Sequence, residues 1–514
     1  MSKVDEFALA NPISLLCDKE RHDFTREDLI NVMMKQGIER ITFHYTSIDG
    51  KIKELKIPVA NRSQAELILT EGERVDGSSL FKGIVDTGKS DLYVVPLYKS
   101  AFLNPFDCKS LDFICRFFDK EGELASFPPD NVLNKANTML KANTGLDLYA
   151  LGELEFFLIG NFINNTYPMP KQKGYHASAP YVKSGELINE MTSHLARITG
   201  LIKYAHNEVG YIERLISDFD ELDGKSAEQV EVEFLPAPIE EAADMLVLAR
   251  WIIRNVAYRH GFVATFAPKL EIGHAGNGMH VHMALMKDGR NIMASADGML
   301  TEEAKACIGG LCHYAQSLTA FGNTVSGSYL RLVPNQEAPT KVCWSELNRS
   351  ALIRVPLGWG NISNLAGKIN PQQKAARSGE IGRQTVELRS PDGSCNTHLL
   401  LAGITLANEW GLTKRKESLA LAEHSYAPLN IHECSSVQEL AELATSCAES
   451  AEILLRDRQL FEKNNIFSSG LINHIAYMLD SENDRNLNKR LFALPDDEKQ
   501  KESRRIMHRD IHKH

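Results

Sequence analysis

The chain has 514 residues, of which 43% are hydrophobic and 24% are charged, a composition typical of a soluble globular protein with a sizeable core. Its 57 basic and 67 acidic residues give a formal net charge of −10, which argues against a nucleic-acid-binding protein. The nine cysteines form no CxxC pair. The sequence therefore indicates neither a disulfide framework nor a zinc knuckle, and it favours a reducing compartment, the cytoplasm.

The first elements along the chain are those of a small α+β module. A helix is predicted from Thr25, a candidate N-cap, to Gly37, which ends it. Alternating apolar residues on both sides of Asp49-Gly50 predict a β-hairpin from Arg40 to Val59. A glycine- and serine-rich loop and a short strand follow. We place the end of this N-terminal domain near Pro105, giving it residues 1–105.

The following part of the sequence, residues 106–480, predicts one large domain of mixed α and β structure. It contains strand-like runs such as Tyr149–Ile159 and helical patterns such as Glu240–Arg259 and Ala304–Phe321. Residues 481–514 are strongly charged and predict a C-terminal helix or tail rather than core. The most apolar stretch, Leu399–Leu412, is too short to cross a bilayer, so we expect no membrane partner.

Residues Gly83–Ser90, GIVDTGKS, match the phosphate-binding pattern GxxxxGK[ST], which would make Lys89 and Ser90 nucleotide ligands. A true phosphate loop leaves a buried strand and opens a helix whose N-terminus holds the anion. This segment follows another flexible loop and leads into the strand-like run DLYVVPL. We therefore interpret the match as fortuitous.

Four strand-like segments carry polar residues two positions apart, a spacing that places each pair on one face of its strand. One such pair is ordinary on the solvent side of an antiparallel strand, but four favour a shared cavity. The pairs are Glu153 with Glu155, Glu231 with Glu233, His280 with His282, and Glu387 with Arg389.

The charges of such a cavity predict its ligands. Its carboxylates could not all stay ionised in a poorly solvated space without cations, and oxygen-rich groups with an imidazole suit Mg²⁺ or Mn²⁺ better than a structural zinc. Arginines would balance bound phosphates, as in an ATP-dependent ligase or kinase. The carboxylates are Glu153, Glu155, Glu208, Glu231 and Glu387, and the arginines are Arg331, Arg349, Arg354 and Arg389.

Eight motifs then occur in one order, and through them the chain resembles the glutamine synthetase family, most of all its bacterial type I members, from about residue 25 to about residue 425. The motifs are DGSS at Asp76, ExE at Glu153, HNEV at His206, QVE at Gln229, GNGMHVH at Gly276, RLVPNQEAP at Arg331, NRSALIRVP at Asn348 and VELRSPDGS at Val386. The resemblance implies an α+β fold with a small N-terminal β-grasp-like domain. It also implies a large catalytic domain whose curved antiparallel sheet forms a funnel-shaped active site.

The resemblance further implies a role for each site residue. The metal ions, Mg²⁺ or Mn²⁺, would be held by two groups: Glu155, Glu208 and Glu231, and Glu153, His280 and Glu387. The ATP phosphates would meet His282, Arg349 and Arg354, and the substrates would meet Tyr175, Gly276, Arg331 and Arg389. Asp76, Glu337 and Arg349 would be catalytic. Glu337 would be the base on the closing loop, and Asp76 would serve the ammonium site of a neighbouring subunit.

The implied reaction joins ammonia to the γ-carboxylate of glutamate. ATP phosphorylates the carboxylate, and ammonia attacks the resulting γ-glutamyl phosphate to give glutamine, with ADP and phosphate as the other products. Because family members form rings with active sites between subunits, the resemblance implies a homo-oligomer, namely a dodecamer of two hexameric rings.

Two departures from the family pattern keep alternatives open. The segment between Glu208 and Glu231 is longer than in the family, so it either forms a surface excursion or changes a metal ligand. Ala275 stands where type I enzymes usually carry an asparagine near the substrate amino group. The alternatives are a γ-glutamyl-amine ligase that uses polyamines or alkylamines, and a non-catalytic ring-shaped sensor.

Overall fold

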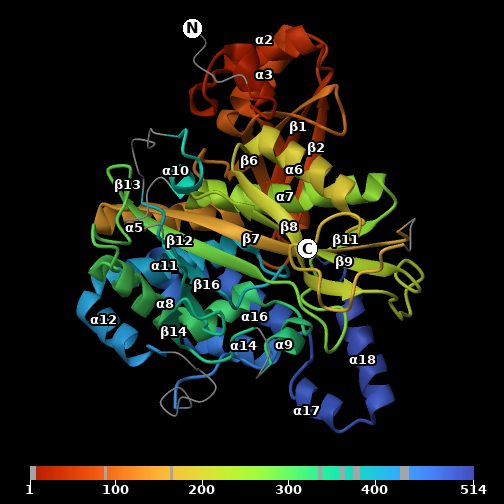
Figure 1. Ribbon diagram of the computed structural model, residues 1–514. Coiled ribbons are helices and arrows are strands. Elements are labelled where there is room, and N and C mark those ends of the chain that lie inside the picture. The colour runs from red at the N-terminus through yellow and green to blue at the C-terminus, as the bar shows by residue number, and fades with distance from the viewer. Residues whose placement is uncertain are drawn as a thin grey trace.

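The computed structural model describes residues 7–85, 90–162, 166–333, 338–358, 365–373, 382–428 and 439–513. Two residues singled out in the sequence, Glu337 and Lys89, lie outside these ranges. The described chain forms a smaller N-terminal domain, seen at the top of Figure 1, and a larger domain beneath it.

The N-terminal domain is a six-stranded sheet with helices packed against it (Figure 1). The strand order is β2-β1-β6-β4-β3, and β5 pairs with β6. Its strands are β1 Arg40–Thr46, β2 Ile52–Pro58, β3 Glu73–Asp76, β4 Asp91–Pro96, β5 Phe102–Leu103 and β6 Ser110–Phe118. Its helices are α1 Pro12–Cys17, α2 Arg26–Gln36, α3 Arg62–Glu71 and α4 Gly77–Leu80.

The two elements predicted at the start of the chain are present. Thr25 caps α2 in a capping box with Asp28, and Gly37 ends the helix with a left-handed φ of 61°. β1 and β2 form the antiparallel hairpin. The sheet also extends past Pro105, because β6 pairs with β1 in parallel and with β4 in antiparallel fashion.

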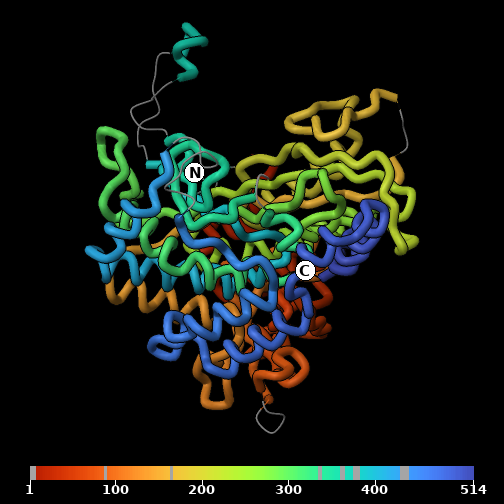
Figure 2. Tube along the Cα trace, turned by 90° about the horizontal axis from the view of Figure 1, so that it is seen from below, coloured from red at the N-terminus to blue at the C-terminus, as the bar shows by residue number. Residues whose placement is uncertain are grey.

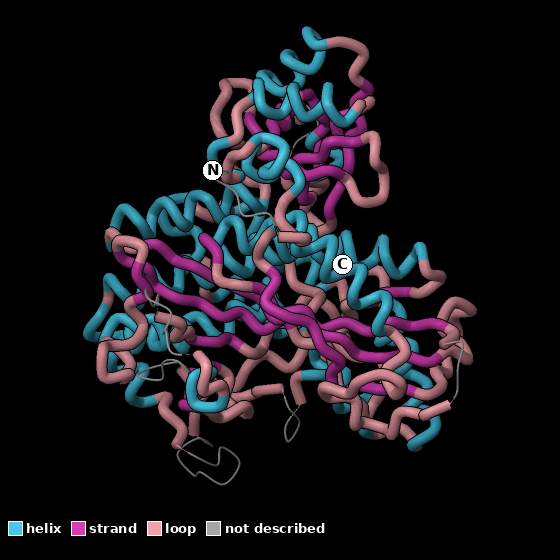
Figure 3. Tube along the Cα trace, turned by 45° about the horizontal axis from the view of Figure 1, so that its top comes forward, coloured by secondary structure: helices cyan, strands magenta, loops and turns pink. Residues whose placement is uncertain are grey.

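The larger domain is built on a curved ten-stranded sheet, whose strands cross the width of the molecule in Figure 3. The strand order is β14-β15-β16-β12-β7-β9-β8. Neighbours are antiparallel except for β14 and β15. The long strands are β7 Asp147–Gly160, β8 Ile202–Ile212, β9 Ser226–Phe234 and β12 Met279–Lys287. The short ones are β10 Ala237–Pro238, β11 Val263–Thr265, β13 Arg290–Asn291, β14 Trp344–Glu346, β15 Ile353–Val355 and β16 Val386–Leu388.

Apolar helices pack behind this sheet and leave its other face to polar side chains. The principal ones are α5 Pro129–Thr144, α7 Ile239–Arg259, α8 Glu302–Gly322 and α11 Thr397–Thr413, with α6 Gly185–Thr199, α12 Arg415–His424, α14 Cys447–Arg456 and α16 Ser469–Asp480 around them. Helices α8 and α11 pack so closely that only glycine fits at position 310 of α8. A Cβ added there would lie 2.1 Å from the Ala407 carbonyl oxygen of α11, which is closer than atoms can approach. Each helix in the described ranges is too short or too polar to cross a bilayer.

The charged C-terminal segment is helical and closes against the larger domain. It forms α17 Leu487–Phe492 and α18 Asp496–Arg509, the dark-blue end of the tube in Figure 2, which lies beside yellow-green segments of the larger domain. Met507 and Ile511 are buried, and the Thr265 hydroxyl donates to the Ile511 carbonyl at 2.8 Å. The segment is helical as expected, but it also contributes to the core, because Leu487, Leu491, Met507 and Ile511 are buried while Phe492 stays exposed.

Candidate active site

The four strands that carry the polar pairs are consecutive neighbours in the sheet, in the order β16-β12-β7-β9. Residues directly opposite each other on paired strands project from the same face. The opposed residues are His282 with Glu387, His280 with Glu153, Glu153 with Glu233, and Glu155 with Glu231. The pairs predicted from their spacing in the sequence therefore do share one surface.

One part of this surface, which we call the basic half, comprises Glu153, His280, His282, Arg354, Glu387 and Arg389. Glu387 is fully buried and accepts hydrogen bonds from Arg354 at 2.8 Å and from Arg389. Glu153 lies between the imidazoles, 2.9 Å from His280 Nδ1 and 2.9 Å from His282 Nε2. Each buried carboxylate in this half thus has cationic or hydrogen-bonding partners.

Those partners keep the two carboxylates ionised. Burial alone would raise the pKa of Glu153, but the charge of His282 and the hydrogen bond from His280 hold that pKa well below its ordinary value. Burial is likewise outweighed at Glu387, whose pKa is lowered by His282 and Arg389. The pKa of His280 falls to about 4, because burial and the charge of Arg389 both disfavour its protonation. A neutral imidazole is the form that binds a metal ion.

The other part, the acidic half, comprises Glu155, Glu208, Glu231 and His206. Glu155 accepts from the Gly278 amide at 2.8 Å, and His206 lies 3.5 Å from Glu231 and 3.8 Å from Glu208. Burial and the charges of Glu231 and Glu208 raise the pKa of Glu155 to about 8. Burial, together with the charges of Glu153 and Glu208, raises the pKa of Glu231 to about 7 despite the hydrogen bond from His206.

The long segment between Glu208 and Glu231 continues the hairpin of β8 and β9 beyond the site. Tyr211 pairs with Glu228 after a register shift that begins at Asn207, and the turn closes farther out along the chain. Glu208 stays within reach of Glu231. Of the two alternatives left open by the sequence, the structure therefore matches the surface excursion.

Arginines line the edge of the basic half. Arg331 is buried and donates to the Ser390 carbonyl at 2.9 Å. Its guanidinium lies against the glycine-rich turn: a Cβ at Gly278 would stand 2.8 Å from Arg331 Nη2, and one at Gly276 would stand 2.5 Å from the Pro268 carbonyl oxygen. The buried Nε atoms of Arg354 and Arg389 have no hydrogen-bond partner in the described part of the chain. Donors held in this way suit an anionic ligand.

The remaining predicted residues lie farther from the two halves. Tyr175 is 49% exposed, and its ring centroid is 5.5 Å from that of His206, beside the acidic half. Arg349 is exposed between β14 and β15. Asp76 is exposed in the N-terminal domain, where hydrogen bonds from Ser78 and Ser79 lower its pKa to about 2. These bonds keep Asp76 ionised on a surface separate from the site of its own chain.

Two residues of the site, His206 and Gln229, were assigned no role from the sequence. His206 continues the spacing of two before Glu208, and this signal could have identified it. Glu233 is buried and bonded by Lys203. Gln229 supports Glu155 from the neighbouring strand, because its amide nitrogen lies 3.3 Å from the Glu155 carboxylate and 2.9 Å from the Gly276 carbonyl oxygen.

The donor atoms fit divalent cations. Among the residues that the structure describes, three groups have ligand atoms that all lie within 4.8 Å of one another: Glu153, His282 and Glu387; His206, Glu208 and Glu231; and Glu153, Glu231 and Glu233. Carboxylate oxygens with single imidazoles suit Mg²⁺ or Mn²⁺. His280 also reaches Glu387, at 3.8 Å, so both imidazoles of β12 border the same carboxylates.

A cation-binding acidic half beside an arginine-lined basic half is typical of enzymes that transfer phosphoryl groups with the help of divalent ions. The family comparisons agree with this class. The chain matches the family model described as "Glutamine synthetase, catalytic domain" over residues 127–489 and the one described as "Glutamine synthetase, beta-Grasp domain" over residues 37–120. The chain belongs to the glutamine synthetase family, and it is a ligase of that family.

Relatives and solved structures span nearly the whole chain. A glutamine synthetase of Mycolicibacterium smegmatis is 28% identical over 89% of this chain and 95% of its own length. One of Pyrococcus horikoshii is 32% identical over 76% and 77%. A glutamine synthetase structure of Plasmodium falciparum aligns with a TM-score of 0.72 at 21% identity, over 91% and 98% of the two chains. A structure titled GmaS/ADP complex aligns with a TM-score of 0.68 at 19% identity over the same shares, and these two likenesses establish the fold.

Proposed function

We propose that the protein is an ATP-dependent glutamate–ammonia ligase that forms glutamine through a γ-glutamyl phosphate. The observation that carries the proposal is the register of β16-β12-β7-β9, which sets a cation-binding half directly beside an arginine-lined half. Phosphoryl transfer to a carboxylate brings anionic groups together, and catalysis consists mostly of positioning them and stabilising their charge.

In the first step, residues of this chain would hold the γ-carboxylate of glutamate in line with the terminal phosphate of ATP. Arg331 and Arg389 would bind the carboxylates of glutamate, with Gly276 and Gly278 leaving space for Arg331. Arg354, Arg349 and His282 would contact the transferring phosphoryl group. Divalent ions, when bound, would supply charge neutralisation for the phosphates. Glutamate Oε would attack the terminal phosphorus of ATP, and ADP would leave.

In the second step, an ammonium ion must lose a proton before its nitrogen can attack the acyl phosphate. Glu208 lies at the rim of the acidic half beside His206 and Tyr175, where a small cation would be attracted. We propose that Asp76 of a neighbouring subunit completes this pocket in a ring of subunits, a dodecamer of two hexamers. Its exposed, ionised carboxylate fits that role. Glu337, the base on the closing loop, would complete the ammonium pocket together with Tyr175.

One observation favours an organic amine as a second candidate substrate. The rings of Tyr175, His176, Tyr204 and His206 gather at the acidic half, with centroids 4.2 Å apart for His176 and His206 and 5.7 Å apart for Tyr204 and His206. Such ring faces could contact an alkyl group beside a charged amine. The fold shared with GmaS is compatible with either substrate.

The two candidates separate in a nitrogen-donor screen. Purified protein is supplied with ATP, Mg²⁺ and glutamate, and then with ammonium, methylamine or a polyamine, and phosphate release and product mass are measured. We expect release with ammonium and a product of the mass of glutamine. Release with an organic amine alone would assign the second candidate, and no release with any donor despite ATP binding would favour the sensor.

A variant pair tests the phosphoryl-facing role. Arg354→Gln should lower kcat by about 10²–10³-fold, because a donor aimed at developing charge is lost. Arg456→Gln is the matched control, since Arg456 is exposed and paired with Asp457 at the surface. A kcat for Arg354→Gln within a factor of three of the wild-type value would remove Arg354 from the reaction.

A further inference from the structure

Helix α7 carries two arginines one turn apart, Arg250 and Arg254, on the side of the larger domain that faces the N-terminal hairpin. Residues at i and i+4 of a helix are neighbours, and like charges there repel. Within the described ranges of the chain, neither arginine forms an ion pair with an acid. Placing two cations close together in a poorly solvated site without a counter-charge costs folding free energy. Such a pair therefore favours the binding of an anion, and the surrounding residues indicate which kind.

Arg250 is 3% exposed and is only partly satisfied. Its Nη1 donates to the Cys395 carbonyl at 3.2 Å, and its Nη2 lies 3.1 Å from Cys395 Sγ. Sulfur is a weak acceptor. Its Nε has no partner among the residues that the structure describes.

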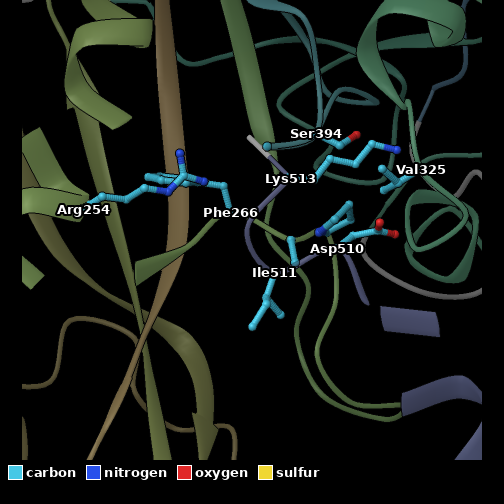
Figure 4. Close-up of a pocket in the computed structure, with 10 residues that line it drawn as sticks. Arg254, Phe266, Val325, Ser394, Asp510, Ile511 and Lys513 are labelled. Atoms are coloured by element: carbon cyan, nitrogen blue, oxygen red, sulfur yellow. The ribbon is translucent and has the colours of Figure 1, made fainter. Parts of the chain in front are cut away.

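Arg254 is half-buried, and its guanidinium packs over the Phe266 ring at 4.9 Å from the centroid. Its Nη2 is a buried donor with no partner in the described part of the chain. Burial and the charge of Arg250 lower its pKa to about 9, so it is still a cation at neutral pH. In Figure 4, Asp510 lies on the far side of Phe266 from Arg254, and Asp510 forms an ion pair with Arg509 at 3.3 Å.

Both arginines line a pocket of about 210 Å³ that the two domains form together. The hairpin turn contributes Gly50, Lys51 and Ile52, and α7 contributes Val247, Trp251 and Asn255. Burial lowers the pKa of Lys51, and Arg254 adds to this effect although the charge of Asp49 opposes it. The nearest hairpin acids are already engaged. Asp49 pairs with Lys53 at 2.9 Å and also favours the charged form of Lys51, and Glu54 pairs with Lys56 at 3.1 Å and accepts from Trp251 Nε1 at 3.2 Å. The pocket thus presents three cations and a side-chain amide.

We propose that this pocket between the hairpin and α7 is a binding site for a small dianionic oxyanion, held by Arg250, Arg254 and Lys51. Phosphate and dicarboxylates share the required chemistry, because their oxygens accept the paired donors of a guanidinium. The site lies outside the active site, on the other side of β7 and β12. Arg250 nevertheless contacts Met279, the residue before His280, at 3.4 Å from its sulfur. An anion here would join the N-terminal domain to the strand that carries the active-site histidines.

The test titrates the intact full-length protein with inorganic phosphate and, separately, with malonate, and follows binding by calorimetry. We expect Arg254→Gln to weaken the binding of at least one probe by about tenfold or more, because a charged hydrogen bond is lost. Arg259→Gln, an exposed arginine on the same helix, should leave that affinity unchanged. Whichever probe shows the difference identifies the oxyanion as a phosphate or a carboxylate.

Thermal stability provides the second readout. Without added anion, Arg254→Gln should unfold at or above the wild-type temperature, since it removes an uncompensated cation, and saturating anion should reverse that order. Lys51→Gln, at the hairpin surface, gives a variant that leaves α7 intact and should weaken binding as well. Equal affinities in wild type, Arg254→Gln and Lys51→Gln would overturn the proposal. So would a wild type that is already the more stable protein without anion, because a carboxylate of a neighbouring subunit would then fill the pocket.

Discussion

The basic half and the acidic half of the site lie on the same sheet face, yet they treat their carboxylates in opposite ways. In the basic half, arginines and histidines surround Glu153 and Glu387 and lower the pKa of each. In the acidic half, carboxylates crowd one another, and the pKa values of Glu155 and Glu231 rise to about 8 and about 7. The first half is balanced by the protein's own arginines and histidines, whereas the second is neutralised only by taking up protons or a cation.

This difference indicates that the basic half binds anions and the acidic half binds cations. A balanced half keeps its geometry without a ligand and can present donors to an anion. An unbalanced half holds repulsion that a divalent ion or an ammonium ion relieves on binding.

The largest expected effect is the loss of Glu387 from the balanced half. Glu387→Gln leaves the Arg354 and Arg389 guanidinium groups without their shared carboxylate, and it should lower the free energy of unfolding of the metal-free protein by about 3–5 kcal/mol. Urea denaturation at fixed protein concentration measures this. Glu346→Gln, an exposed acid on β14, is the control. A loss below about 1 kcal/mol would show that the arginines do not depend on Glu387.

Glu155→Gln should raise the free energy of unfolding of the metal-free protein at alkaline pH, whereas Glu387→Gln lowers it. Because the folded pKa of Glu155 is raised, the folded protein binds more protons than the unfolded chain, and the stability of the metal-free wild type falls as pH rises from about 4.5 to about 8. The glutamine variant removes that slope and should be the more stable protein at pH 9. Denaturation midpoints across this pH range test the prediction, and parallel curves for the two proteins would contradict it.

A smaller effect is the proton release that accompanies metal binding. At pH 7 Glu155 is mostly protonated and Glu231 about half so, and Mn²⁺ should therefore displace about one proton or more on binding to the acidic half. Calorimetry in two buffers of different ionisation enthalpy counts these protons. The number should fall at pH 9, and a count of zero at pH 7 would mean that the carboxylates are already ionised.

Local signals in the sequence were sufficient for much of the fold and the site. The capping box at Thr25, the turn at Gly50 and the spacing of two in β7, β9, β12 and β16 are short-range features, and the structure has each of them. The eight motifs then supplied the family, which the comparisons confirm.

What the sequence did not predict depends on contacts between distant segments. β6 joins the N-terminal sheet through a parallel pairing with β1, and no local pattern encodes a partner some seventy positions away. The pairing of His206 with Glu231 depends on the register of the long β8–β9 hairpin. The two arginines of α7, which form no ion pair with the described residues, became informative only when the hairpin was seen to close over them.

We infer that side chains from four adjacent strands form a two-part site for divalent cations. The most direct measurement is a crystal structure of the protein with Mn²⁺, with the ions located by anomalous scattering. We expect one ion among Glu155, Glu208 and Glu231 and a second among Glu153, Glu387 and a histidine of β12. Manganese absent from both positions, or bound only elsewhere on the surface, would contradict it.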